Sequence, residues 1–210
     1  MITDRIDPLA IAPSTASTWN IANALTVFRL VLVPFFAAAL LAHDGSRSSW
    51  RVAAWALFAL ASWTDRLDGQ LARSRNLVTS FGKLADPIAD KALTGTALVG
   101  LSSLGELPWL VTVVVLVREL GVTLLRFWVI RHGVIPASRG GKLKTLLQGV
   151  AIGLYVLPLT GLLASSRAVV MGLAVAVTVV TGVDYVARAL TLRQTSDRAA
   201  MKRARKAARP

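Results

Sequence analysis

Long apolar runs separated by short polar stretches dominate the hydrophobic pattern of the chain. Within each run the apolar residues follow one another continuously instead of alternating with polar ones, which favours helices over the strands of a membrane barrel. Each run has roughly the twenty residues that a membrane-spanning helix needs. The pattern therefore predicts an all-α integral membrane protein, a six-transmembrane-helix bundle with spans at residues 21–42, 49–72, 78–102, 108–131, 144–164 and 168–191.

The two ends of the chain lack such runs. Residues 1–18 mix Pro, Ser, Thr and a few charges, which predicts a flexible or surface-lying segment without the pattern of a signal peptide. Residues 192–210 are rich in Ala, Lys and Arg. Their composition favours a disordered cytoplasmic tail, with a helix lying on a lipid surface as the alternative. Residues 19–191 then form the transmembrane domain.

Composition agrees with a membrane protein, because 54% of the 210 residues are hydrophobic, 17% are charged and the mean hydropathy is +0.58. The chain has no cysteine, so oxygen or imidazole must hold any metal ion. The net charge of +13 is also found in nucleic-acid binders. However, eight of the 24 Lys and Arg residues lie between Arg188 and Arg209, and most others border apolar runs. This distribution indicates contact with anionic lipid headgroups and argues against nucleic acid.

The same basic residues predict an orientation. The connection at residues 102–108 contains no Lys or Arg, whereas the connections after the second and fourth runs and the C-terminal segment are basic. By the positive-inside rule, both termini and these two connections face the cytoplasm. Arg47, Arg51 and Arg167 lie on the other side, so they reduce the excess of basic residues on the cytoplasmic side without reversing it. We expect a multi-pass protein of the plasma (inner) membrane with a cytoplasmic active site.

Four aspartates stand at the ends of two neighbouring apolar runs. Asp65 and Asp68 are three residues apart, and Asp86 and Asp90 are four apart, so each pair shares one helix face. A short connection brings the two pairs together, where they repel each other unless a positive charge compensates them. An oxygen-only cluster of this kind suits Mg²⁺, Mn²⁺ or Ca²⁺. The alternative is that these aspartates only cap helices, which explains one of them better than all four.

Small residues stand at fixed distances from these aspartates. The order is Asp65-x-x-Asp68-Gly69-x-x-Ala72-Arg73, then eight residues, then Gly82-x-x-x-Asp86-x-x-x-Asp90. This spacing resembles the complete signature of the CDP-alcohol phosphotransferases. The resemblance implies six transmembrane helices, a homodimer and a polar cavity open to the cytoplasm. It also implies a divalent-metal site for two ions of Mg²⁺ or Mn²⁺, CDP-diacylglycerol as donor and CMP as product.

Carried over onto this chain, the resemblance assigns roles to these residues. Two metal ions that bridge a pyrophosphate neutralise the charge developing on the leaving CMP. A carboxylate within hydrogen-bond reach of the acceptor hydroxyl takes its proton, and Asp90 matches this general base while also touching the second metal. The metal ligands match Asp65, Asp68, Asp86 and Asp90, and the CDP-lipid-binding positions match Asp65, Gly69, Ala72, Arg73 and Gly82.

A second polar group surrounds the fourth apolar run. Guanidinium groups inside a span are costly unless they meet an anion, and a single glutamate pairs well with only one of them. The spare positive charge predicts an acceptor that carries a phosphate. Arg188 either joins this phosphate site or only pairs with Asp184, four residues before it on the same helix. The other residues of the group are Arg118, Glu119, Arg126, Lys142 and Lys144.

The chain also resembles one branch of this family, which uses glycerol 3-phosphate as acceptor and forms phosphatidylglycerophosphate. The likeness lies in Arg118–Glu119, in the run GKLKT at 141–145 and in NIANALTVFRLVLVP, whose supporting residues are Asn23, Thr26 and Arg29. Inositol phosphate is an alternative acceptor, and an uncharged alcohol would leave the basic residues without a partner. A cation transporter is a remote alternative, because the acids gather at one membrane border instead of continuing through it.

Overall fold

The protein is described by a computed structural model that covers residues 20–74, 79–129 and 139–207, without the side chains of 72–73, 80, 83–84, 126–129, 139 and 193–207. The prediction for residues 1–18 lies outside these ranges. Within them the chain is helical and contains no strand. The elements are α1 (Ile21–Leu41), η1 (Ala42–Gly45), α2 (Ser48–Ser74), α3 (Ser80–Ser103), α4 (Trp109–Val129), α5 (Arg139–Val156) and α6 (Gly161–Ala207).

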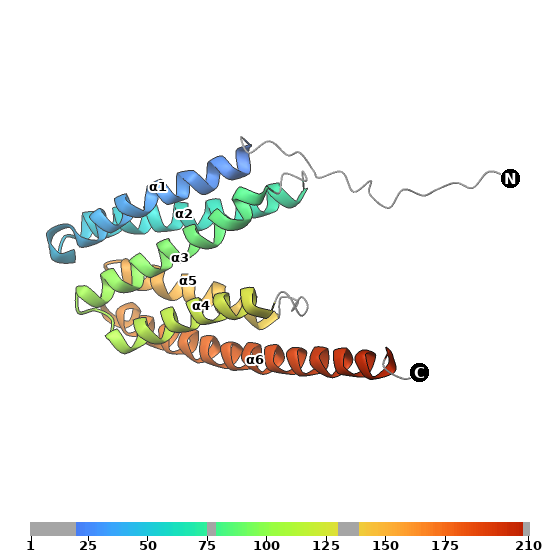
Figure 1. Cartoon of the computed structure of the whole chain (residues 1–210). Coiled ribbons are helices and arrows are strands. Elements are labelled where there is room, and N and C mark those ends of the chain that lie inside the picture. Colours follow the sequence, from blue (N-terminus) through green and yellow to red (C-terminus); the bar gives the residue numbers. More distant parts are fainter. Residues whose placement is uncertain (1–19, 75–78, 130–138, 208–210) are drawn as a thin grey trace.

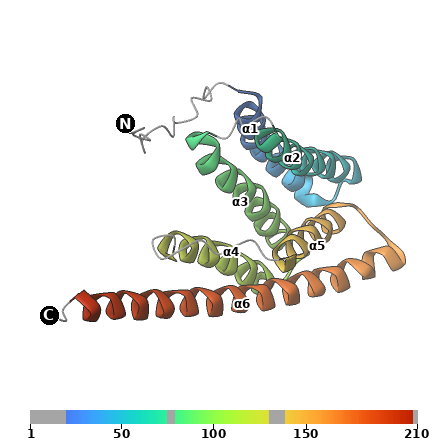
Figure 2. The same cartoon turned by 90° about the vertical axis from the view of Figure 1, so that its right-hand side faces the viewer.

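The helices form two groups. α1 packs against α2 and α3, while α6 packs against α5 and α4. Figures 1 and 2 show α3 leading from the first group to the second, with α6 as the longest element. The links between α1 and α2, α3 and α4, and α5 and α6 lie at one end of the molecule (Figure 1). The opposite end, where α3 and α5 begin, is called the site end below.

Side-chain caps and backbone breaks set the helix bounds. Asn20 caps α1 by accepting a hydrogen bond of 2.9 Å from the Asn23 amide, and Thr79 caps α3 by accepting one of 3.0 Å from the Gly82 amide. Gly161, with φ of 63°, adopts the left-handed conformation that favours glycine, and α6 starts there. The two caps matter for function because both sit at the site end, beside the aspartates.

Two expected boundaries differ from the structure. The predicted fifth span, 144–164, is instead α5, which starts at Arg139 and ends at Val156, because Pro158 cannot continue a helix and Gly161 reverses the backbone. α6 also extends to Ala207, where composition favoured a disordered tail. The reason is local, since no Gly or Pro interrupts residues 183–209 and Ala, Arg and Lys are strong helix formers.

Within the described residues, two segments are long and apolar enough to cross a membrane. They are Ile21–Gly45 and Gly161–Leu192, with mean hydropathies of 2.2 and 2.0. Only 33% and 22% of their most apolar windows are buried, unlike the core helix of a soluble protein. Large apolar side chains project from them and from α4, with Leu162 91% exposed, Leu110 74% and Val180 68%. These surfaces fit a lipid environment. The other helices carry charged residues within their length, which lowers their hydropathy.

The interior is built from small residues and a few large ones. Phe36 of α1 and Phe58 of α2 place their rings 5.7 Å apart, centroid to centroid. Gly100 of α3 lies so close to α1 that an added Cβ would stand 2.7 Å from Leu40 Cδ2. Close packing of this kind holds helices together in lipid, where the hydrophobic effect between them is weak. Buried alanines at such contacts are Ala39, Ala54, Ala61, Ala89, Ala97 and Ala151.

An ion-pair cluster closes the end opposite the site end. Arg51, 3% exposed, forms an ion pair of 2.5 Å with Glu106 and donates to the Val156 carbonyl at 2.9 Å. Arg167 reaches the same carboxylate at 3.1 Å and lies over the Tyr155 ring. We call these five residues the Arg51 cluster. Arg51 and Arg167, which weakened the orientation count, therefore share Glu106, which compensates one of their two positive charges.

Candidate active site

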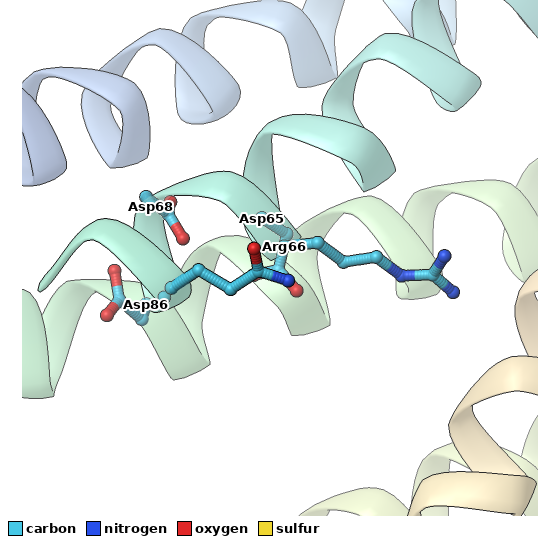
Figure 3. Close-up of a pocket in the computed structure, with 6 residues that line it drawn as sticks. Asp65, Arg66, Asp68 and Asp86 are labelled. Atoms are coloured by element: carbon cyan, nitrogen blue, oxygen red, sulfur yellow. The ribbon is translucent and has the colours of Figure 1, made fainter. Parts of the chain in front are cut away.

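Three of the four aspartates meet at one cavity of about 360 Å³ between α2 and α3. α2 supplies Asp65 and Asp68 one turn apart, and α3 supplies Asp86. Figure 3 shows Asp68 and Asp86 on adjacent helices beside the cavity, with the Arg66 guanidinium extending away from them. The remaining lining residues are Gly69 and Gln70. The structure thus places the first three aspartates of the signature together, as their spacing predicts.

Asp90 lies apart from this cavity. It is exposed, one turn after Asp86 on α3, and it interacts electrostatically with Asp65, Glu119 and Lys144. Its carboxylate therefore lies within electrostatic range of both Asp65 and a second polar cluster formed by α4, α5 and α6.

α1 completes the aspartate site from the other side. Thr26 donates a hydrogen bond of 2.7 Å from its hydroxyl to Asp86. Asn23, one turn earlier, accepts a hydrogen bond of 3.0 Å from the Thr79 hydroxyl, the N-cap of α3. Arg29 lies one turn later, and because the three residues are three apart they share one helix face. The three supporting positions expected on α1 therefore reach the site, whereas Glu119, the fourth expected supporting residue, lies on α4 and pairs with Lys144.

Gly82 shows how closely α1 and α3 approach each other here. A Cβ at this position would stand 2.9 Å from Asn23 Oδ1, 3.3 Å from Thr79 Oγ1 and 3.9 Å from Asp86 Oδ2. A contact under 3.0 Å forces atoms to shift, and two of these three belong to the hydrogen bonds that hold the site together. The absence of a side chain at Gly82 thus allows α1 and α3 to pack this closely.

The charge of Arg29 is buried against the first two aspartates. Its guanidinium lies 2.7 Å from Asp65 and also pairs directly with Asp68. The Arg29 side chain is 0% exposed and that of Asp68 is 3% exposed. As the side chains stand, no three His or acidic residues of the described part of the chain are grouped closely enough to hold a metal ion. Arg29 is the positively charged partner of both carboxylates.

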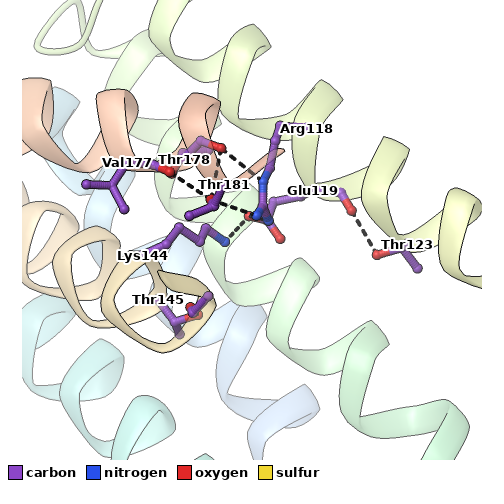
Figure 4. Close-up of polar contacts among 9 residues, drawn as sticks. Arg118, Glu119, Thr123, Lys144, Thr145, Val177, Thr178 and Thr181 are labelled. Carbon is purple, nitrogen blue, oxygen red and sulfur yellow. Dashed lines mark hydrogen bonds and ion pairs between the residues drawn. The ribbon is translucent and has the colours of Figure 1, made fainter. Parts of the chain in front are cut away.

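The second polar cluster joins α4, α5 and α6 (Figure 4). Glu119 of α4 pairs with Lys144 of α5 and, at 3.3 Å, with its neighbour Arg118. Arg118 also donates to the Thr178 carbonyl at 3.2 Å and to the Thr181 hydroxyl at 3.1 Å on α6. All three donor groups of Arg118 are therefore engaged, which makes it a tether between α4 and α6. Among the described residues, Lys144 has the Glu119 carboxylate as its one side-chain partner.

Several residues expected at the phosphate site are not brought to this cluster. Lys142 is exposed, two residues from buried Lys144, and such a spacing places the two on nearly opposite faces of α5. Arg188 is exposed and pairs with Asp184 at 2.9 Å, so the structure shows the ion pair within one helix. The side chains of Arg126, Ala72 and Arg73 lie outside the described part.

Sequence reasoning missed several polar residues near the two sites. Gln148 lies one turn after Lys144 on α5 and is 5% exposed, and its buried Oε1 has no hydrogen-bond partner in the described part of the chain. An amide four residues from a buried lysine in an apolar run was the available signal. Arg66 and Gln70 line the cavity, and they escaped notice because they fall between the fixed positions of the signature.

Comparison with known proteins adds a second line of observation. A family model described as CDP-alcohol phosphatidyltransferase matches residues 19–180. The chain is 61% identical over 181 residues to a protein of Mycobacterium tuberculosis (strain CDC 1551 / Oshkosh) named "Probable phosphatidylglycerophosphate synthase", covering 84% of this chain and 87% of that one. The family model therefore spans the aspartate cavity and, apart from Thr181, the second polar cluster.

More distant relatives carry a name of the same kind. The chain is 35% identical over 192 residues to the "CDP-diacylglycerol--glycerol-3-phosphate 3-phosphatidyltransferase" of Bacillus subtilis (strain 168), covering 85% of this chain and 100% of that one. It is 36% identical over 171 residues to the identically named protein of Rickettsia felis (strain ATCC VR-1525 / URRWXCal2), covering 79% of this chain and 93% of that one.

Proposed function

This chain belongs to the CDP-alcohol phosphatidyltransferase family, and on that premise we propose that it transfers the phosphatidyl group of CDP-diacylglycerol to glycerol 3-phosphate. The products are phosphatidylglycerophosphate and CMP, which places the enzyme in phospholipid biosynthesis. The observation that carries this proposal is the convergence of Asp65, Asp68 and Asp86 on one cavity, at the spacing of the family signature. The names of the relatives at 61%, 36% and 35% identity support the choice of acceptor.

A divalent cation, Mg²⁺ or Mn²⁺ and two ions in number, is the cofactor we propose. Three carboxylates and no thiol at the cavity form the hard oxygen donor set that these ions prefer. Asp65, Asp68 and Asp86 would hold the metal at the cavity, and Asp90 is the fourth ligand that the family resemblance implies. When bound, the metal neutralises charge on the pyrophosphate and polarises the phosphorus under attack. The rotamers of Asp65 and Asp68 must change for this, because Arg29 engages both carboxylates.

The residues of the chain account for the rest of the reaction. Asp90 takes the proton of the acceptor's 1-hydroxyl, and that oxygen forms a bond to the phosphorus attached to diacylglycerol. The bond between this phosphorus and the bridging oxygen of the pyrophosphate breaks, and CMP leaves with the electron pair. Gly69 lines the cavity without a side chain, which leaves space for the nucleotide beside α2. The CDP-lipid roles of Asp65, Ala72, Arg73 and Gly82 belong to the same proposal.

Lys144 is the residue we propose to bind the acceptor phosphate. It is buried, it pairs with Glu119, and it interacts electrostatically with Asp90. A phosphate at Lys144 would therefore hold the acceptor near the base that deprotonates it. Arg118 contributes by fixing α4 against α6, and its Gly182 neighbour leaves room for it, since a Cβ there would stand 3.1 Å from Arg118 Cγ.

The membrane arrangement is part of the proposal. We infer six spans in the plasma (inner) membrane with both termini and the site end in the cytoplasm, supported by the basic residues at that end. The family resemblance supports a homodimer. The basic end of α6 would contact anionic headgroups, because Lys and Arg gather there. A cysteine-accessibility map of single-Cys variants tests the orientation directly, since the natural chain has no cysteine.

Release of CMP tests the activity. Purified protein in detergent micelles should release CMP from CDP-diacylglycerol when Mg²⁺ and glycerol 3-phosphate are both present. Chelation of the metal should stop the reaction, and restoring Mn²⁺ should restart it. Inositol phosphate and uncharged glycerol, supplied in turn, test the alternative acceptors. Folded protein that releases no CMP with glycerol 3-phosphate would exclude the proposed acceptor, and release with inositol phosphate alone would replace it.

A further inference from the structure

Arg29 occupies an unusual position for an arginine of an apolar helix. It lies in α1, its side chain is fully buried, and its guanidinium bridges two carboxylates of α2. Asp65 is 2.7 Å away with a side chain 43% exposed, and Asp68 is in direct contact and almost fully buried. These are the two aspartates that open the metal-binding signature. A cation supplied by the protein thus stands where the family chemistry calls for a metal.

The charges around Asp68 explain why a cation is needed. Asp68 is 2% exposed and interacts repulsively with Asp65 and Asp86, while Arg29 is its attractive partner. A buried carboxylate beside two others is unfavourable without a compensating positive charge. Arg29 therefore keeps the aspartate site folded whenever nothing else neutralises it.

The hold on Arg29 is nevertheless incomplete. Its Nε and Nη1 atoms are buried and have no hydrogen-bond partner among the described residues. The 2.7 Å approach of Nη1 to Asp65 is therefore an ion pair without hydrogen-bond geometry. A permanent structural arginine is expected to satisfy its donors, as Arg51 does with Glu106 and the Val156 carbonyl. Arg29 is instead held mainly by charge, and a stronger charge at the same carboxylates can replace it.

We propose that Arg29 is a displaceable counter-ion, which neutralises Asp65 and Asp68 in the metal-free protein and releases them when a divalent cation binds. This inference rests on the proposed metal site and adds to it. The guanidinium and the cation compete for the same carboxylate oxygens, and their like charges repel. Binding of the two is therefore negatively coupled, and such coupling is reciprocal. Removing Arg29 must strengthen metal binding and weaken the metal-free fold.

Arg29→Met tests the coupling, because Met keeps much of the length and removes the charge. Mn²⁺ binding to purified protein in detergent is measured by electron paramagnetic resonance, and thermal unfolding is followed with and without Mg²⁺. We expect Arg29→Met to bind Mn²⁺ about tenfold more tightly than the natural protein, within the usual range of coupling between two sites. Without metal, the variant should melt at a lower temperature than the natural protein. Mg²⁺ should raise the melting temperature of the variant more than that of the natural protein.

Arg66→Met is the matched control, because Arg66 lines the same cavity but is exposed and engages neither carboxylate in the described contacts. It should change Mn²⁺ affinity less than about twofold, since exposed charges are screened. An equal increase in Mn²⁺ affinity for Arg29→Met and Arg66→Met would assign the effect to general electrostatics and overturn the displacement proposal. Unchanged or weaker Mn²⁺ binding by Arg29→Met would overturn it as well. If the natural protein binds no Mn²⁺, the metal site itself fails.

A second variant covers the case in which Arg29→Met does not fold. Arg29→Lys keeps the charge but replaces a planar fork by a single ammonium, which bridges two carboxylates less well. It should fold and bind Mn²⁺ more tightly than the natural protein, by a smaller factor than Arg29→Met. Arg29→Met that folds only with Mg²⁺ present would also support displacement. Arg29→Lys with natural or weaker Mn²⁺ affinity would contradict it.

Discussion

The hydroxyl of Thr26 donates a hydrogen bond of 2.7 Å to the carboxylate of Asp86, so a residue of α1 orients an aspartate of α3. The contact is part of a joint in which Asn23, Thr26 and Arg29 of one helix face serve three different partners. The geometry of the aspartate site therefore depends on α1, although no fixed position of the family signature lies in that helix.

Thr26→Val should lower activity while preserving the fold. Val keeps the shape of Thr but cannot donate to Asp86. Losing a group that orients a metal ligand reduces metal affinity or activity by about tenfold to a hundredfold. CMP release and Mn²⁺ binding measure the effect, and Thr26→Ser, which restores the hydroxyl, should recover most of both. Equal activity of the Val and natural proteins would show that the hydrogen bond does not position Asp86.

Asp90→Asn and Asp68→Asn should fail in different ways. Asp90→Asn should reduce turnover by about a hundredfold or more, the contribution of a general base, and largely keep Mn²⁺ and CDP-lipid binding. Asp68→Asn should weaken Mn²⁺ binding itself, and it should also lower thermal stability because it leaves buried Arg29 with fewer negative partners. Identical behaviour of the two variants in turnover and in metal binding would refute separate roles.

Lys144→Met and Lys142→Met compare the two lysines of the GKLKT run. Lys144 is buried beside Glu119, whereas Lys142 is exposed. Lys144→Met should raise the KM for glycerol 3-phosphate about tenfold or more, because a hydrogen bond to a charged group contributes about 1.5–3 kcal/mol. The KM for CDP-diacylglycerol should change little, and Lys142→Met should change neither. A larger effect at Lys142 would move the phosphate site to the outer face of α5.

Gly82→Ala should separate α1 from α3 at the site. The added Cβ would meet Asn23 Oδ1 at 2.9 Å and Thr79 Oγ1 at 3.3 Å. Overpacking typically costs about 1–3 kcal/mol, so the melting temperature and CMP release should both fall. Gly121→Ala is the control, because a Cβ at that helical glycine meets nothing within 4 Å and Ala favours helix. A Gly82→Ala protein as stable and active as Gly121→Ala would contradict the close joint.

Glu106→Gln should destabilise the end remote from the chemistry. It breaks the pairs with Arg51 and Arg167, and Arg51 is 3% exposed. We expect a loss of about 2–3 kcal/mol, less than for a fully buried pair, with CMP release per folded molecule unchanged. Asp184→Asn removes the exposed pair with Arg188 and should cost less than about 1 kcal/mol. Thermal unfolding compares the two, and equal losses would deny the Arg51 cluster a special role.

The sequence predicted the aspartate site well because its rules are local. Spacings of three and four along α2 and α3 determine which aspartates share a face, and a short connection brings the two faces together. The place of Lys144 depended on a helix boundary instead. A span starting at residue 144 leaves both lysines in the preceding loop or at its edge, while α5 starts at Arg139 and its phase turns Lys144 inward.

The sequence did not predict the partners of Arg29 and Arg51, because those contacts join segments that are distant along the chain. The pairing of Arg29 with α2 spans 39 residues along the chain, and that of Arg51 with Glu106 spans 55. No periodicity connects such positions, so Arg29 looked like one of several supporting residues and Arg51 like an exception to an orientation rule. The length of α6 agrees with the high helix propensity of its C-terminal residues. The sequence analysis instead gave more weight to the charged composition and favoured a disordered tail.

An apolar first helix is easily mistaken for a removable leader. Here α1 delivers the guanidinium that shields Asp68 and the hydroxyl that steers Asp86. A polypeptide that lacks the residues before 48 would leave the aspartates close together in an apolar environment without a compensating charge. We expect the remaining helices to lose their packing or to be degraded. Supplying α1 as a separate peptide should therefore restore folding of such a fragment, because the peptide returns Arg29 and Thr26 to the aspartates.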